Sequence, residues 1–90
     1  MAQHLHASIA DCTRALLCEG LDELLGQPSG RLAPVACWEP LRLLLEALPL
    51  DSTEFSLAWN RLANARHYLE SGERGAARFE LRLLRRGLAQ

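Results

Sequence analysis

Apolar residues, most of them leucine, recur at intervals of three and four positions in four successive stretches of this chain. Because an α-helix completes a turn every 3.6 residues, that interval places the apolar side chains on one face of a helix. The stretches span residues 4–25, 39–48, 51–71 and 75–88. The chain holds 20 Leu and 13 Ala but only one Ile and one Val, so residues that favour strands are scarce. The sequence therefore predicts an all-α fold, a small bundle of about four helices.

Residues that begin or end helices separate the four stretches. Two Pro and two Gly within residues 26–34 predict a loop, and Pro49 stops the second helix. Ser8 or Asp11 could cap a late start of the first helix, and the run from Asp51 to Glu54 has the form of a capping box. Gly72 ends the third helix, so the short connection at 73–75 predicts an antiparallel hairpin of the last two helices. Ninety residues suit one domain, and residues 1–90 are expected to be a single helical domain.

Each helix has a predicted buried face. The four faces comprise Leu5, Ile9, Cys12, Leu16, Leu17, Leu21, Leu24 and Leu25 in the first helix, Leu41, Leu44, Leu45 and Leu48 in the second, Phe55, Ala58, Leu62, Ala65 and Leu69 in the third, and Ala77, Leu81, Leu84 and Leu88 in the fourth. Trp59, Phe79 and Leu83 widen the last two faces beyond the roughly 100° that one core contact needs. Because a large apolar surplus usually marks an interface, we expect a homodimer.

The predicted hairpin resembles a single tetratricopeptide unit over residues 58–88. The positions that carry the resemblance are Ala65, Tyr68, Gly72, Ala77, Leu81 and Leu84, while Arg61 and Asn64 replace the Trp and Leu that the family has early in its first helix. The resemblance implies a helical hairpin that holds a helix of another protein, as adaptors and small chaperones of type III secretion do. One unit cannot bury its own face, and residues 1–50 contain no second copy. The first two helices or a second subunit would therefore cover the hairpin.

Two groups of residues are candidates for binding a partner. Arg74, Arg78, Arg82 and Arg85, with Arg86 adjoining, recur at helical spacing and predict a cationic stripe along the outer face of the last helix. The stripe could bind an acidic protein or, as an alternative, nucleic acid. It could also be solvated surface, because cations near a helix C-terminus are favoured by the helix dipole and acidic residues of the first half could pair with them. Trp38 and Trp59 are the second group, because an exposed Trp anchors partners well, although core packing explains them too.

No residue pattern marks a catalytic site. His4 and His6 stand two apart and would point to different sides of a helix, so they predict no metal site. Cys12, Cys18 and Cys37 could pair with a base such as His67, but buried Cys usually acts as a small apolar residue. We expect no cofactor and no enzyme activity; an all-helical mutase that clamps dicarboxylates is the enzyme alternative.

Charge and cysteine content narrow the function further. Residues 1–60 hold three Arg against eight acidic residues, and residues 61–90 hold seven Arg against three, so the net charge of −1 conceals two halves of opposite sign. An odd number of Cys, no secretory leader and no long apolar run indicate a cytoplasmic protein with no membrane partner. The sequence is typical of a helical protein–protein interaction module: an adaptor, a small chaperone or a regulatory dimer. The alternatives are a nucleic-acid-binding regulator and a small helical enzyme.

Overall fold

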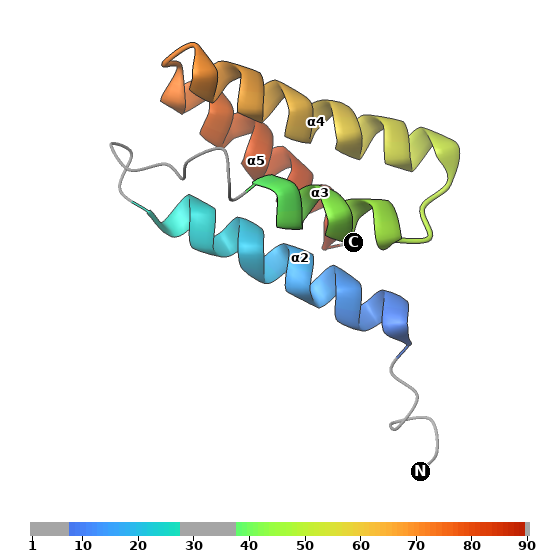
Figure 1. The fold of residues 1–90 in the computed structure, drawn as a ribbon. Helices are drawn as coiled ribbons and strands as arrows, with labels where there is room; N and C mark the ends of the chain where they lie inside the picture. Colours follow the sequence, from blue (N-terminus) through green and yellow to red (C-terminus); the bar gives the residue numbers. More distant parts are fainter. Residues whose placement is uncertain (1–7, 28–37, 90) are drawn as a thin grey trace.

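The computed structural model describes residues 8–27 and 38–89 of the chain, and these residues form four α-helices and no strand (Figure 1). The helices are α2 (Ile9–Gly26), α3 (Trp38–Ala47), α4 (Ser52–Glu70) and α5 (Arg74–Leu88). The all-α fold predicted from the leucine spacing is confirmed, and so is the closing hairpin of α4 and α5. The expectations for His4, His6, Cys37 and the loop after Gln27 concern residues outside the described ranges.

The helices pack in a ring in which each contacts two neighbours. α3 and α5 both pack against α2 on one side and against α4 on the other. In Figure 1, α4 lies at the top, α2 at the bottom, and α3 stands in front of α5. The outward side of the α2–α3 pair therefore faces away from the outward side of the α4–α5 pair.

Side-chain caps begin two of the helices where the sequence predicted them. Ser8 Oγ accepts a hydrogen bond from the backbone N–H of Asp11 at 3.1 Å and caps α2. At α4 both bonds of the capping box form: the Glu54 N–H donates to Asp51 Oδ1 at 2.8 Å, and the Asp51 N–H donates to Glu54 Oε1 at 3.2 Å. Gly72 then has a φ of +80°, the left-handed conformation that the turn into α5 requires and that glycine adopts without strain.

One apolar core joins the four helices. Its buried members are Leu17, Leu21, Leu24, Trp38, Leu41, Leu45, Leu48, Ala58, Leu62, Ala65, Ala77, Leu81, Leu84 and Leu88. Ala65 and Ala77 have no exposed surface, and such small side chains let α4 and α5 approach closely. The predicted inner face of α5 is confirmed at all four positions.

The predicted buried face of α2 is wrong in its first half. Ile9 is 85% exposed and Leu16 55% exposed, and Cys12 is exposed as well. The reason is geometric: the spacing of Ile9, Cys12 and Leu16 continues on a face adjacent to that of Leu17 and Leu21, and only the second face turns toward α3 and α5.

Candidate functional site

The arginines of α5 do not form the continuous outward stripe that their spacing predicts. The guanidinium of Arg78 donates to the backbone carbonyls of Leu25 and, at 3.0 Å, Gln27, which close the C-terminal end of α2. Arg85 pairs with Asp22 of α2, Nε to Oδ1, at 2.9 Å, and this hydrogen bond raises the pKa of Arg85. Two of the four predicted stripe residues therefore bind the first helix of the same chain.

A third arginine completes this attachment from the opposite direction. Arg14 of α2 donates from Nη1 to the carbonyl of Leu88, at the C-terminal end of α5, over 3.0 Å. The last carbonyls of a helix have no partner within the helix and carry partial negative charge, so a guanidinium is well suited to them. α2 and α5 are thus antiparallel and hold each other's C-terminal ends.

The other arginines of α5 remain on the surface. Arg74, Arg82 and Arg86 are exposed, and no ion pair involves them within residues 8–27 and 38–89. Arg61 of α4 is half-buried and is paired with Glu80 of α5, 3.6 Å from Nη1 to Oε1. Positive charge available to another molecule is therefore concentrated on α5.

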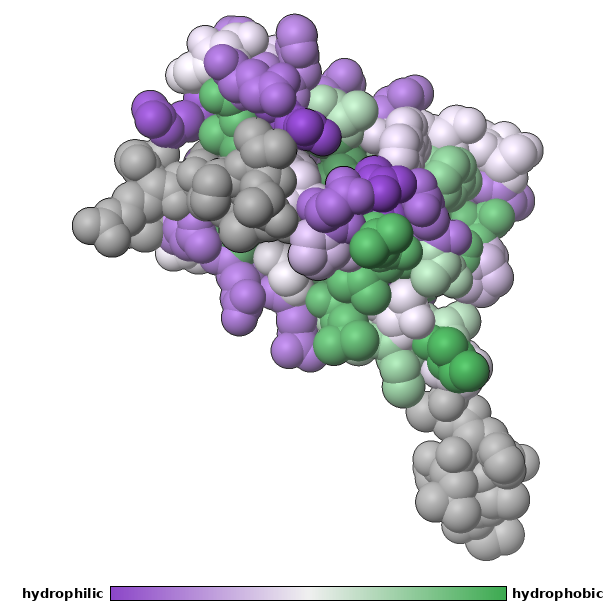
Figure 2. Space-filling view, viewed as in Figure 1, coloured by the Kyte–Doolittle hydropathy of each residue, from purple (hydrophilic) through white to green (hydrophobic). Residues whose placement is uncertain are grey.

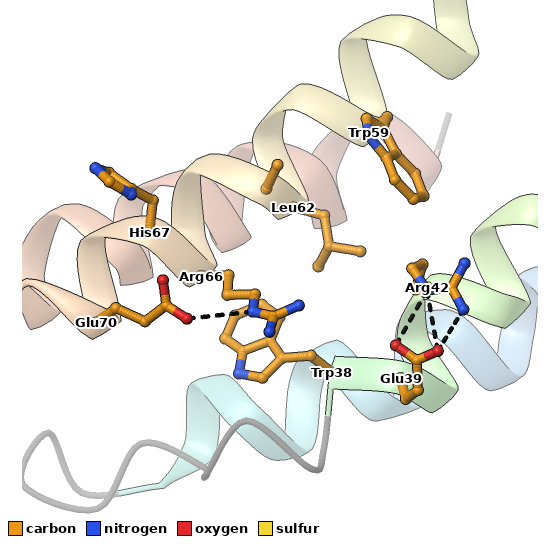
Figure 3. Close-up of a pocket in the computed structure, with 9 residues that line it drawn as sticks. Trp38, Glu39, Arg42, Trp59, Leu62, Arg66, His67 and Glu70 are labelled. Carbon is orange, nitrogen blue, oxygen red and sulfur yellow. Dashed lines mark hydrogen bonds and ion pairs between the residues drawn. The ribbon is translucent and has the colours of Figure 1, made fainter.

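Trp38 and Trp59, the other predicted partner-binding residues, line one groove between α3 and α4 (Figure 3). We call this groove of about 240 Å³ the tryptophan groove. Trp38 is only 3% exposed and packs into the core, as the alternative of core packing predicted for this residue. Trp59 is half-buried and stacks on Phe55, with ring centroids 5.7 Å apart.

The rim of the tryptophan groove is neutralised by its own ion pairs. Arg42 binds both Glu39 and, at 2.6 Å, Glu46, and Arg66 Nε lies 3.4 Å from Glu70 Oε2. The hydrogen bond from Arg42 lowers the pKa of Glu39. His67 also lines this groove, exposed on α4. The groove offers an apolar floor but little unpaired charge to select a partner.

A second groove lies between α4 and α5, beside the start of α2. We call it the basic groove; it measures about 380 Å³, and its lining includes Leu57, Leu83 and Leu88, three arginines (Arg14, Arg61 and Arg86) and one acidic residue, Glu54. Leu57 is 55% exposed although it directly precedes the buried Ala58. Phe79, four residues before Leu83 and therefore on the same side of α5, is 57% exposed. Apolar side chains and arginines thus meet at one solvent-filled hollow.

Most of this groove is not predicted by the spacing of residues in the sequence. Leu57 lies off the predicted inner face of α4, and that isolated position four residues before Arg61 was the available signal. Spacing alone places Leu83 beside the inner face of α5 and Arg86 beside the arginine stripe, and it does not bring the two to one hollow. Which residues of α4 and α5 share the hollow depends on how far the two helices are offset along their axes, and spacing within one helix does not contain that offset.

The outward side of α2 and α3 carries a third surface, which we call the acidic face. Figure 2 shows hydrophobic side chains gathered there, and three large ones are strongly exposed: Ile9, Leu16 and Leu43. Glu19 and Glu23, three and seven residues after Leu16, continue the same side of α2. On α3, Glu39 and Glu46 flank Leu43 at helical spacing. With Arg42 the only cation among these groups, this surface has excess negative charge.

The cysteine and histidine candidates do not assemble into a site in the described part of the chain. Cys12 is exposed and Cys18 half-buried on α2, whereas His67 is on α4, which lies across the ring from α2. No group of three or more metal-ligating side chains occurs among residues 8–27 and 38–89. In those same ranges, no helix has both the length and the apolar content to cross a membrane.

No protein-family model matches the sequence, and neither a curated protein nor a solved structure is similar enough to it to count as a match.

Proposed function

We propose that this chain is a helical protein–protein interaction module that binds an amphipathic helix of its partner in the basic groove. The observation that carries the proposal is the exposure of Leu57 beside Leu83 and the exposed Arg86 in one hollow of about 380 Å³. Helix-in-groove binding needs a row of apolar pockets for side chains spaced three and four residues apart. The hollow between two antiparallel helices provides such a row.

The arginines around the groove define the chemistry of the partner. Arg61 and Arg86 line the groove, so a bound helix would place its flanking residues against these guanidinium groups. Acidic flanks suit them, and charges at the rim of an interface mainly raise the association rate and make it sensitive to salt. Arg74, at the start of α5, does not line the groove.

The resemblance of the hairpin to a tetratricopeptide unit supports the same class of function. In this proposal, α2 and α3 cover the inner side of the hairpin and leave its outer side for the partner, as an adaptor or small chaperone would. The chain needs no catalytic residue for this role.

Binding of a defined peptide tests the proposal. The probe is a synthetic helix with leucines at three-and-four spacing and glutamates on its flanks, titrated against the protein by fluorescence anisotropy and by amide NMR shifts. We expect shifts at Leu57, Leu83 and Arg86. Leu57→Glu should weaken binding at least tenfold, and Arg86→Glu should slow association and reduce its salt dependence.

Ala63→Glu is the matched control, because Ala63 is exposed on α4 but lines the tryptophan groove instead. This control should bind the peptide like the original chain. If Leu57→Glu binds the peptide normally and Ala63→Glu does not, the peptide binds in the tryptophan groove, and the assignment of the basic groove as the binding site is wrong. A single-stranded oligonucleotide that binds where the peptide does not would support a nucleic-acid role instead.

A further inference from the structure

We propose that the partner of the basic groove is a second copy of this chain, which docks its acidic face there in a head-to-tail contact. The inference rests on the proposed function and names the occupant of the same groove. It requires two complementary surfaces on one molecule that cannot reach each other within that molecule. The structure provides both.

The two surfaces match in shape and apolar character. The acidic face presents side chains that project from a helix, with Ile9 85% exposed and Leu16 55% exposed about two turns further along α2. The basic groove is a hollow of about 380 Å³ with an apolar lining. Ile9 and Leu16, with Cys12 between them, have the three-and-four spacing that a helix needs to fill such a groove.

The two surfaces are also opposite in charge. The acidic face has Glu19 and Glu23 on α2 and an excess of carboxylates on α3, whereas the groove is lined by Arg14, Arg61 and Arg86 against one carboxylate, Glu54. A symmetric dimer through either surface alone would place like charges against each other, because the same patch then meets itself. Charge therefore favours contact between unlike surfaces.

The positions of the two surfaces determine the kind of assembly. The acidic face lies on the outward side of α2 and α3, whereas the basic groove is lined mostly by residues of α4 and α5. These two pairs of helices form different sides of the ring (Figure 1). When the acidic face of one copy docks in the basic groove of another, the pair still has one free basic groove and one free acidic face. Further copies can then add, so the average mass should rise steadily with concentration and not stop at twice the 10.0 kDa chain mass.

Two variants, each with one of the two surfaces disrupted, test the contact directly. Leu16→Glu places a charge in the apolar part of the acidic face, and Leu57→Glu does the same in the basic groove. Both residues are more than half exposed, so neither substitution disturbs the core. We expect each variant alone to be monomeric by sedimentation at concentrations where the original chain associates. An equimolar mixture should form a discrete pair of about twice 10.0 kDa, because each variant keeps the surface the other lacks. Ala63→Glu, outside both surfaces, should associate like the original chain.

Other outcomes overturn the inference and separate it from the proposed function. If the mixture stays monomeric, or if the original chain is monomeric at millimolar concentration, no head-to-tail contact exists. The proposed function still stands if Leu57→Glu loses the acidic peptide. If Leu16→Glu is monomeric while Leu57→Glu still pairs, the acidic face forms a symmetric dimer and the groove has another occupant. If Leu57→Glu neither loses the peptide nor changes association, both proposals are wrong.

Discussion

Gly20 shows how a single residue in α2 depends on its neighbour across the bundle. A Cβ at this position would lie 2.8 Å from Cδ2 of Leu41 on α3, a side chain that is 5% exposed. Alanine normally stabilises a helix by about 1 kcal/mol relative to glycine, but overpacking a core costs about 1–3 kcal/mol. We therefore expect Gly20→Ala to lower the free energy of unfolding by up to about 2 kcal/mol in urea denaturation.

Gly87 of α5 is the matched control, because a Cβ there meets no other atom within 4 Å. Gly87→Ala should raise the free energy of unfolding by about 0.5 kcal/mol, less than the full propensity difference because the residue is in the last turn. In a double-mutant cycle, Leu41→Ala should cost less when Gly20 is already alanine. A stabilising Gly20→Ala would show that Leu41 moves aside easily and that α2 and α3 pack less tightly than the structure indicates.

Arg78 acts at the scale of the helices, because it joins α5 to the end of α2. Hydrogen bonds from charged groups contribute about 1.5–3 kcal/mol each, and Arg78 gives two to carbonyls that would otherwise depend on water. Arg78→Met keeps most of the aliphatic stem and removes both bonds, so the free energy of unfolding should fall by about 1.5–3 kcal/mol. Arg82→Met, one turn further on at an exposed position, should change it by less than about 0.5 kcal/mol. Equal effects of the two substitutions in chemical denaturation would contradict this role of Arg78.

The elements also show what sequence reasoning can reach. The caps at Ser8 and Asp51, the turn at Gly72 and the inner face of α5 were predicted because each depends on residues within a few positions of one another. The roles of Arg78 and Arg85 were not, because their partners are more than 50 residues away on α2. Spacing showed that these arginines share one side of α5, but only the packing of α2 beside them determines which of them solvent reaches.

At the scale of the whole molecule, the four helices do not contribute equally to the core. α5 buries four residues along its inner side against α4, and the alanines at positions 65 and 77 are fully buried between them. α3 is only 10 residues long, Pro49 follows it closely, and the tryptophan groove separates part of it from α4. Small elements with a hollow beside them open at low free energy, whereas a closely packed pair opens only when the whole domain unfolds.

Native-state hydrogen exchange measures this difference directly. The amides of Leu44 and Leu45 in α3 should exchange through local opening, with a free energy well below that of global unfolding and little dependence on added denaturant. The amides of Leu81 and Leu84 in α5 should exchange at the global value and with the full denaturant dependence, because exposing them requires α4 and α5 to separate. If both pairs of amides give the same free energy and the same denaturant dependence, the four helices unfold as one unit and α3 is as firmly held as the hairpin.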